Sequence, residues 1–424
     1  MRKLLLLQPP TLSEGRSGLY SLAALATFVE NDCEVRVWDP AHEPLEETIL
    51  EFVPDIVGIT SYTATYAEAI ATMTVARHVL PEALRIIGGV HITCLPESLA
   101  EVFDAGVVGD GELTLLDLVR RGTRQTISGI PGVCFRQSSR VKVNHRRTVD
   151  HPTLPIPQLH KYAPHSYEGG IVAFVTSRGC PFACAFCYSP VVRDGVRYYP
   201  VNWVAEQFEY AVNTLKADFL MLLDDTVCLD INRLHALAEE LDRRRLANYR
   251  VAVNVRSSAV TGELCLALQK LHVVSWNCGF ESGSDRILKT IKGPFCTVEK
   301  HRDMVRLAHR FGFTLNGSFM FGMPEETIDD MEQTIQFMEF LYNEKCAHRY
   351  KGGFWFLCAT PFPGTPWWTI AGAKGKVNSK MDWTKLDVKS WEHHLMLDDT
   401  ISPHQWNHVR ERATQIVEKA NGIY

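Results

Sequence analysis

The stretch Thr176-Ser177-Arg178-Gly179-Cys180-Pro181-Phe182-Ala183-Cys184-Ala185-Phe186-Cys187-Tyr188 carries three cysteines at Cys-x3-Cys-x2-Cys spacing. It directly follows the apolar, β-prone residues 171–175, which predict a buried strand that opens into a ligand-binding loop. Thiolates hold iron–sulfur clusters, and a cluster of four irons normally takes four of them. Three thiolates on one loop therefore predict a 4Fe-4S cluster bound by Cys180, Cys184 and Cys187, with one iron open to a further ligand.

Two other interpretations of these cysteines remain open. A structural zinc site needs four ligands, usually in two Cys-x2-Cys or Cys/His pairs, and the sequence contains no second pair. The other alternative is three unrelated buried thiols. The nine remaining cysteines are scattered along the chain, so we expect them to be buried free thiols.

Length and charge limit the classes of protein that need to be considered. The chain has 424 residues, enough for two or three domains with sizeable cores. Its net charge is −5, from 44 basic and 49 acidic residues, which argues against a nucleic-acid partner. The apolar residues 4–7 stop at Gln8 and are too few for a signal peptide or a membrane span. We therefore expect a cytoplasmic protein without a membrane span, in which clustered cysteines serve metal chemistry.

Residues 1–150 alternate short β-prone runs with helical segments, which predicts an α/β fold with a Rossmann-like (flavodoxin-like) parallel sheet and crossover helices. Strands are expected at residues 4–7, 34–38, 56–60, 85–87 and 106–108, and helices at 19–30 and 66–79. Ligands of such sheets bind at the carboxyl ends of the strands. The candidate binding residues there are Pro9, Thr60, Ser61, Tyr62, Thr63, Gly88, Gly89, His91, Thr93, Gly109, Gly111 and Glu112.

Small residues in these loops allow a large flat ligand to approach the backbone closely. The alternative is a plain flavodoxin-like sheet with tight turns, which the glycine pattern alone favours. A β-hairpin at residues 132–135 and 141–144, followed by a proline-rich segment at 150–164, predicts the domain boundary.

Residues 151–370 contain six further strand–helix units, which predict a partial parallel (β/α)6 barrel. Strands are expected at residues 171–176, 218–223, 250–255, 273–280, 314–321 and 353–358. Helices are expected at residues 204–215, 231–244, 261–271, 298–311 and 329–342. In parallel barrels the active groups lie at the carboxyl ends of the strands.

Polar residues follow successive strands of this barrel at that end. They are Asp224, Asp225, Asn254, Arg256, Glu281, Ser282, Gly322 and Glu325. Carboxylates bind an ammonium group, and a guanidinium binds a carboxylate through two hydrogen bonds. The alternative is that these residues are helix N-caps, a position that Asp and Ser favour. Five consecutive strand ends with such residues favour binding.

The cysteine motif, Leu223-Asp224-Asp225, Gly279-Phe280-Glu281-Ser282-Gly283-Ser284 and Phe319-Met320-Phe321-Gly322-Met323-Pro324-Glu325 resemble, in this order, the core of the radical S-adenosylmethionine enzymes. The resemblance implies that the open iron binds S-adenosylmethionine, with Phe186 and Tyr188 beside it. One departure is Ser318, where related enzymes often carry glycine.

The N-terminal loops are similar to the cobalamin-binding domain of the cobalamin-dependent members of that family, and the whole resemblance covers about residues 3 to 370. The Asp-x-His-x-x-Gly loop that places a histidine on cobalt in some cobalamin proteins is absent. We therefore expect cobalamin with no protein histidine on the metal, neither His42 nor His91.

The resemblance implies a methyltransferase that acts on a small-molecule substrate through a 5′-deoxyadenosyl radical and methylcobalamin, with flavodoxin or ferredoxin as electron donor. Two alternatives remain: an enzyme of the same cofactors that cyclises, oxidises or rearranges its substrate without methyl transfer, and a non-catalytic cobalamin-binding protein. Residues 371–424 are expected to form a small helical cap. Six of the nine tryptophans follow residue 350, and they either wall a pocket over the barrel or pack the cap.

Overall fold

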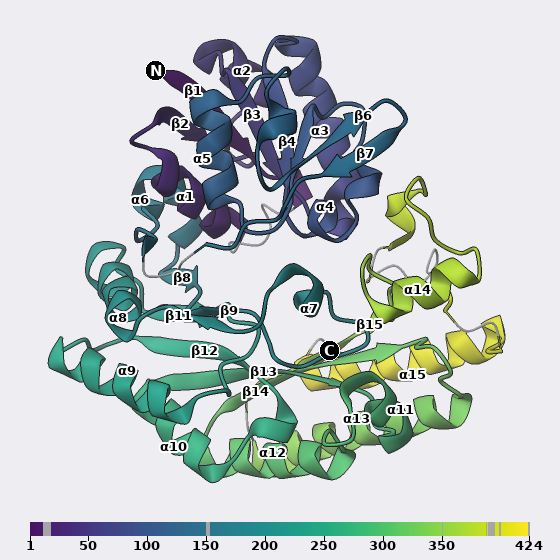
Figure 1. Cartoon of the computed structure of the whole chain (residues 1–424). Helices are drawn as coiled ribbons and strands as arrows, with labels where there is room; N and C mark the ends of the chain where they lie inside the picture. Colours follow the sequence, from purple (N-terminus) through teal and green to yellow (C-terminus); the bar gives the residue numbers. More distant parts are fainter. Residues whose placement is uncertain are drawn as a thin grey trace.

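The computed structural model describes residues 1–11, 18–149, 153–349, 351–386, 388, 395–397 and 400–422. Two sheets dominate it, one in the N-terminal part of the chain and one in the middle part, stacked one above the other in Figure 1. Their order confirms the predicted α/β architecture of a flavodoxin-like sheet followed by a partial barrel. The residue limits predicted for the three domains stay a prediction.

The N-terminal sheet has the strand order β2-β1-β3-β4-β5-β6-β7. Its strands are β1 (Arg2–Leu7), β2 (Cys33–Val37), β3 (Ile56–Thr60), β4 (Leu84–Gly88), β5 (Ala105–Val107), β6 (Val133–Gln137) and β7 (Arg140–Val143). Strands β1 to β5 pair in parallel, and the predicted hairpin β6–β7 adds to β5 in antiparallel orientation. The sheet is therefore parallel with an antiparallel edge.

Helices cover both faces of this sheet, so the residues of β1 alternate between two cores. Leu4 and Leu6 belong to the core with α1 (Gly18–Val29) and α5 (Glu112–Arg121). Leu5 and Leu7 belong to the core with α2 (Leu45–Phe52) and α3 (Tyr66–Val79). A continuous apolar run is what a parallel strand buried on both faces requires. Neither α2 nor α5 was among the helices predicted from the sequence.

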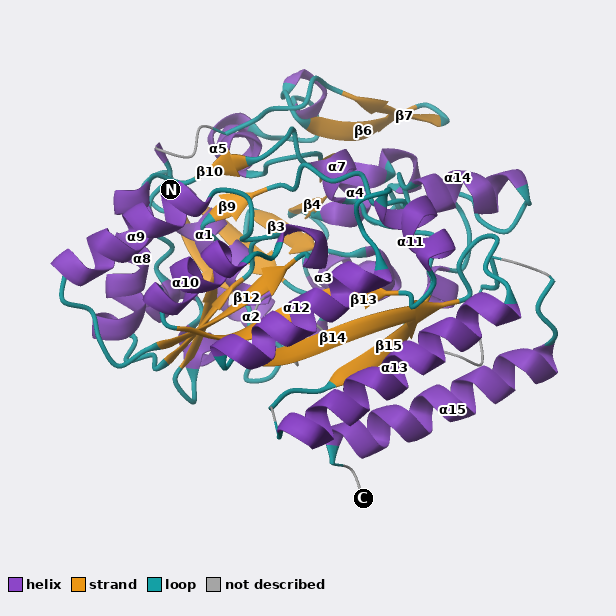
Figure 2. Cartoon of the chain, turned by 90° about the horizontal axis from the view of Figure 1, so that it is seen from below, coloured by secondary structure: helices purple, strands orange, loops and turns teal. Residues whose placement is uncertain are grey.

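The second sheet is parallel, with the order β15-β14-β13-β12-β11-β8. Its strands are β8 (Ile171–Phe174), β11 (Phe219–Leu222), β12 (Arg250–Val255), β13 (Val273–Glu281), β14 (Thr314–Phe321) and β15 (Phe354–Cys358). The helices between them are α8 (Val201–Glu209), α9 (Ile231–Arg243), α10 (Gly262–Lys270), α11 (Asp285–Lys292), α12 (Val298–Phe311) and α13 (Ile328–His348). Figure 2 shows α12 and α13 lying along one side of the curved sheet.

The C-terminal segment packs against several parts of the fold. Trp406 of α15 (Pro403–Asn421) is buried in the core that the barrel strands share, and α15 runs beside α13 in Figure 2. Trp367 of α14 (Pro366–Ala373) packs in a smaller core, and Trp383 belongs to the N-terminal core. The predicted tryptophan-rich segment also includes Trp391, which lies outside the described residues.

No helix within the described ranges combines the length and the apolar character needed to cross a membrane.

Candidate functional site

The three cysteines of the motif line one cavity of about 330 Å³ at the carboxyl ends of the barrel strands. Residues at or just after the carboxyl ends of β11, β12 and β13 complete its wall, namely Asp225, Asn254, Arg256 and Glu281. Lys292 at the end of α11 and Trp355 of β15 also line it. The structure thus brings together the cysteines and four of the predicted polar residues. Phe186 also lines this cavity, with its ring 5.6 Å from that of Trp367.

Hydrogen-bond donors surround the sulfur atoms. Arg256 Nη1 donates to Cys184 Sγ at 3.1 Å, and the Ser189 amide donates to Cys187 Sγ at 3.4 Å. The Arg256 guanidinium also lies over the Phe182 ring, 4.0 Å from its centroid. Burial raises the pKa of the Cys187 thiol to about 11, so a metal must displace its proton for the sulfur to act as a thiolate.

The two neighbouring aspartates have different environments. Asp224 is buried and accepts hydrogen bonds from the amide and hydroxyl of Thr176 and from Ser177, so it fixes the strand end that precedes the cysteine loop. Asp225 is exposed and accepts hydrogen bonds from the Gly179 amide at 3.0 Å and the Ser189 hydroxyl at 3.1 Å. Only Asp225 of this pair is among the described residues that line the cavity.

Glu281 is held inside the cavity by an irregular backbone. The pairing of β13 with β14 shifts register between Gly279 and Glu281, and Glu281 has a φ of 69°. Burial raises the pKa of its carboxyl group, while the ammonium of Lys292, 3.5 Å away, opposes that shift. Sequence reasoning missed Lys292, which lies at the end of a helix with no motif around it.

Three other predicted residues do not line this cavity in the described part of the chain. Ser282 is buried, with its hydroxyl 3.2 Å from that of Thr334 on α13. Gly322 and Glu325 belong to the turn after β14, which Glu326 stabilises by accepting hydrogen bonds from the Gly322 and Met323 amides at 2.7 and 3.0 Å. The carboxylate that organises this turn is therefore Glu326, one residue beyond the predicted Glu325. Burial raises its pKa to about 8.

Tyr188 is a further predicted residue, which lies next to Cys187 and does not line this cavity in the described part of the chain. Burial raises the pKa of its hydroxyl.

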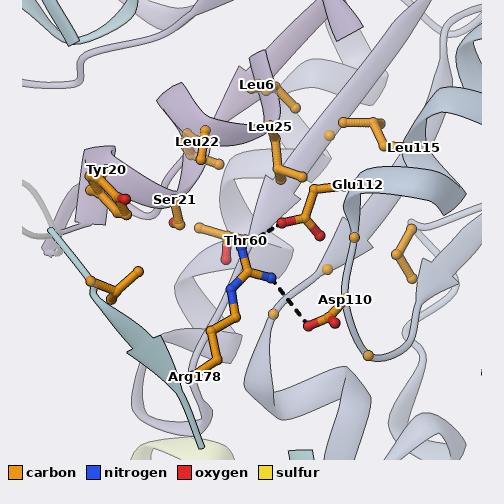
Figure 3. Close-up of a pocket in the computed structure, with 18 of the residues that line it drawn as sticks. Leu6, Tyr20, Ser21, Leu22, Leu25, Thr60, Asp110, Glu112, Leu115 and Arg178 are labelled. Carbon is orange, nitrogen blue, oxygen red and sulfur yellow. Dashed lines mark hydrogen bonds and ion pairs between the residues drawn. The ribbon is translucent and has the colours of Figure 1, made fainter. Parts of the chain in front are cut away.

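A second cavity, of about 270 Å³, lies between the N-terminal sheet and the cysteine loop. We call it the interdomain cavity, and the first one the cysteine cavity. Figure 3 shows Tyr20, Ser21, Leu22 and Leu25 of α1 on one side of it and Arg178 reaching in from the other. The predicted residues in its wall are Thr60, Gly88, Gly89, Gly109, Gly111 and Glu112. Asp225 lines this cavity as well as the cysteine cavity.

Gly89 is required by the close approach of two loops. It has a φ of 98°, and a Cβ atom there would lie 2.5 Å from the Ser61 carbonyl oxygen. Thr93 supports the same arrangement, since its hydroxyl donates to the Gly89 carbonyl at 2.8 Å and accepts from the Gly109 amide at 3.1 Å. Thr93 therefore connects the loops that line the cavity without lining it among the described residues.

His91 is a buried histidine with both ring nitrogens occupied. Nδ1 lies 3.1 Å from the Thr63 hydroxyl and Nε2 lies 2.9 Å from the Ser98 hydroxyl, while Tyr66 stacks on the ring at 3.9 Å. Burial lowers the pKa of His91 to about 3, so it is neutral. Thr63 and His91 thus connect the loops after β3 and β4 to each other, and neither residue lines the cavity in the described part of the chain. Tyr62 is exposed and Pro9 is buried, and neither lines the cavity in the described part.

Two buried side chains beside this cavity lack partners. Both polar atoms of the Gln8 amide and the hydroxyl oxygen of Ser61 have no hydrogen-bond partner among the described residues, and both side chains are at most 1% exposed. Gln8 follows β1, whose Leu6 lines the cavity. An unpaired buried polar group is costly, so these two side chains are candidates for contact with a bound ligand. Ser61 was predicted from its loop, whereas Gln8 lies at the predicted strand end from which only Pro9 was chosen as a binding residue.

An ion-pair network joins the two halves of the molecule at this cavity. Arg178 donates to Glu112 Oε1 at 2.6 Å and lies 3.3 Å from Asp110 Oδ1. Arg193 and Arg197 also pair with Asp110, at 3.2 and 2.7 Å. Burial alone raises the pKa of Asp110, but hydrogen bonding to Arg197 and the charges of Arg178 and Arg197 hold it at about 2. Sequence reasoning missed this network because its members lie far apart in the chain.

Comparison with known families agrees with this division of the chain. Residues 174–338 match the model of the radical SAM superfamily, and residues 17–119 match that of the B12 binding domain. An uncharacterized methyltransferase of Pyrococcus horikoshii is 32% identical over 419 residues, which cover 90% of this chain and 86% of that protein.

A second relative has a different named activity. The anaerobic magnesium-protoporphyrin IX monomethyl ester cyclase of Cereibacter sphaeroides is 27% identical over 346 residues, 77% of this chain and 54% of that protein. The chain thus spans about half the length of the cyclase. Among solved structures, the radical S-adenosylmethionine methyltransferase TsrM from Kitasatospora setae, with tryptophan substrate and a SAM analog bound, superposes with a TM-score of 0.72 at 21% identity. That match covers 88% of this chain and 76% of TsrM and shows a shared fold.

Proposed function

The chain belongs to the radical SAM superfamily and carries a B12-binding domain, and from this premise we propose that it is a methyltransferase that acts on a small-molecule substrate. The observation that carries the proposal is the position of Asp225, which lines both the cysteine cavity and the interdomain cavity. The two sites are therefore neighbours, as a reaction that uses both cofactors requires.

The residues of the cysteine cavity fit a four-iron cluster. Three free thiols from one loop face the same space, and N–H donors already contact two of the sulfurs. Hydrogen bonds to the sulfurs tune such clusters. Cys180, Cys184 and Cys187 would hold the cluster. Asp225 would accept hydrogen bonds from the ammonium group of S-adenosylmethionine, and Arg256 and Lys292 would supply positive charge for its carboxylate.

The interdomain cavity fits cobalamin. Glycines line it where a flat ligand must approach the backbone, and its inner wall contains Leu6, Leu22 and Leu25. Gln8 and Ser61 have polar atoms beside it that are unpaired among the described residues, and we assign these atoms to polar groups of cobalamin. His91 is occupied by its own partners, which supports binding without a histidine on cobalt. When bound, the cluster would supply one-electron cleavage of S-adenosylmethionine and cobalamin would supply methyl-group transfer.

Other residues of the chain connect the two cavities and offer a surface for the substrate. Arg178 connects the cysteine loop to Glu112 and Asp110, so it fixes the distance between the two cavities. Trp355 is exposed in the cysteine cavity and is our candidate for a surface against which the substrate packs. We assign the substrate to small molecules because the comparisons match a radical SAM core and a B12-binding domain and the net charge is −5.

The cluster needs an electron donor, and the free cysteines bear on the compartment. A low-potential donor such as flavodoxin or ferredoxin would reduce the cluster. All twelve cysteines are free thiols, which fits a reducing compartment such as the cytoplasm.

Ring formation without methyl transfer is the second candidate function, because the cyclase of Cereibacter sphaeroides aligns with 77% of this chain. Incubation of candidate metabolites with S-adenosylmethionine that carries a deuterated methyl group separates the two. A methyltransferase gives a product heavier by the labelled methyl group, whereas a cyclase gives a product without the label. An unlabelled product would reject the methyltransferase proposal.

A further inference from the structure

Two histidines from distant parts of the chain stack on each other at the surface. His42 lies in the turn after β2, and His165 lies in the short helix η6 (Pro164–Tyr167) ahead of β8. Their ring centroids are 3.8 Å apart with an angle of 16° between the planes. The side chains are 43% and 40% exposed, so ions in solution reach them.

A carboxylate orients each of these rings. His42 Nδ1 lies 3.0 Å from Asp39 Oδ2, and His165 Nδ1 lies 2.6 Å from Glu168 Oε1. Within the described ranges, neither Nε2 atom has a hydrogen-bond partner. The pair of His42 and Asp39 has the arrangement of metal-binding histidines, in which a carboxylate accepts from one ring nitrogen and the other nitrogen binds the ion. Glu168 differs, because it would itself become a ligand beside His165.

One ligand atom each from His42, His165 and Glu168 lie within 4.8 Å of one another. We propose that these three residues bind a divalent transition-metal ion, with Zn²⁺ as the ion of choice for imidazole and carboxylate ligands. Ligand atoms around a tetrahedral zinc ion lie about 3.3 Å apart, given bonds of about 2.0 to 2.1 Å. Exposed side chains reach that spacing by rotation, and a water molecule completes the four ligands.

A plain surface stack of the two histidine rings is the competing explanation. It accounts for the stacked rings, but it does not require the carboxylate of Glu168 or a bound ion. The metal site has a structural consequence that the stack lacks. The ion would join the turn after β2 to the segment that leads into β8, and would therefore fasten the N-terminal sheet to the barrel at a point independent of both cofactors.

The test is a Zn²⁺ titration of the full chain by isothermal titration calorimetry, with zinc content measured after dialysis. The iron–sulfur cluster must be loaded first, because empty cysteine loops bind zinc through thiolates. The expected result is one Zn²⁺ per chain. His42→Ala and His165→Ala should each weaken binding about tenfold or more, in line with the loss of a metal ligand, and Glu168→Gln should weaken it less. The matched control is His404→Ala on α15, an exposed histidine that should leave binding unchanged.

X-ray absorption at the zinc edge adds a second measurement. Nitrogen and oxygen ligands at about 2.0 to 2.1 Å without sulfur support the site. Sulfur ligands, a stoichiometry well below one, or equal affinity in the His42→Ala variant would show adventitious zinc only and overturn the proposal. All four substituted side chains, His404 included, are exposed, and circular dichroism of each variant verifies that it is folded.

Discussion

Arg178 Nη2 donates a hydrogen bond to Glu112 Oε1 at 2.6 Å, and this bond joins the loop before the cluster cysteines to the N-terminal sheet. Both side chains are nearly buried, at 14% and 5% exposure. The same guanidinium lies 3.3 Å from Asp110. Charged side chains therefore hold the two cavities together at their common border.

Replacing Arg178 by Met should lower the free energy of unfolding by about 3 to 5 kcal/mol, because Glu112 would remain buried without its partner. The double variant Arg178→Met/Glu112→Gln should recover part of that loss, since it removes the unpaired charge. Urea unfolding measures both. The matched control Arg306→Met breaks an exposed ion pair with Glu299 and should change stability by less than about 1 kcal/mol. Equal stabilities of the single and the double variant would show that the pair is not coupled.

Gln8→Leu should affect stability and cobalamin binding in opposite directions. Removal of an unpaired buried amide should stabilise the cobalamin-free protein by about 1 to 3 kcal/mol. The affinity for cobalamin should fall, because the amide is assigned to polar groups of that ligand. Gln207→Leu on α8 is the control, since Gln207 Nε2 is also buried and unpaired within the described chain but lies in the barrel. Unchanged cobalamin affinity in Gln8→Leu would refute the assignment.

Replacement of Cys180, Cys184 and Cys187 by Ala should reduce the iron content from about four atoms per chain to nearly none. Cleavage of S-adenosylmethionine should disappear with it. Cys346→Ala changes an exposed free thiol on α13 and should leave both unchanged. Iron analysis and electron paramagnetic resonance of anaerobically purified protein give the answer. A full cluster in the triple variant would place the cluster elsewhere.

His91 should make stability depend on pH. Burial lowers its pKa to about 3 from the ordinary value of 6.5, so the folded chain keeps it neutral while the unfolded chain takes up a proton. The free energy of unfolding is therefore unaffected by this group above about pH 6.5. Below that pH it decreases by about 1.4 kcal/mol for each pH unit, until the pH reaches the pKa of His91 in the folded chain. His91→Gln should remove that much of the slope between about pH 6.5 and 5, measured by urea unfolding. His301 has the same shift and remains in both proteins. An unchanged slope would contradict the burial argument.

Much of the fold could be predicted from the sequence, because the spacing of apolar residues follows the face that each helix or strand buries. The helices at Tyr66–Val79 and Val298–Phe311 and the strand at Arg250–Val255 match their predictions to the residue. The helices α2 and α5 were missed. Helix α5 begins within the Gly109–Glu112 region that had been interpreted only as a binding loop.

The candidate site was predictable where chain direction determines position. Asp225, Arg256 and Glu281 follow parallel strands, whose carboxyl ends necessarily lie at one edge. Side-chain direction was not predictable, so His91 and Ser282 were grouped with the binding residues although they bond to neighbouring elements. Arg178 and Lys292 acquire their roles only through partners that folding brings close. Glu112, for example, lies 66 positions from Arg178 in the sequence.

The most direct test of the account measures two products of S-adenosylmethionine in one reaction. The full chain, loaded with cluster and cobalamin, is incubated anaerobically with S-adenosylmethionine and a low-potential reductant, and mass spectrometry quantifies 5′-deoxyadenosine and S-adenosylhomocysteine. The account predicts both, with 5′-deoxyadenosine absent from the variant that lacks the three cysteines. Formation of 5′-deoxyadenosine without S-adenosylhomocysteine would contradict methyl transfer and favour the cyclase alternative, and the absence of both would contradict catalysis altogether.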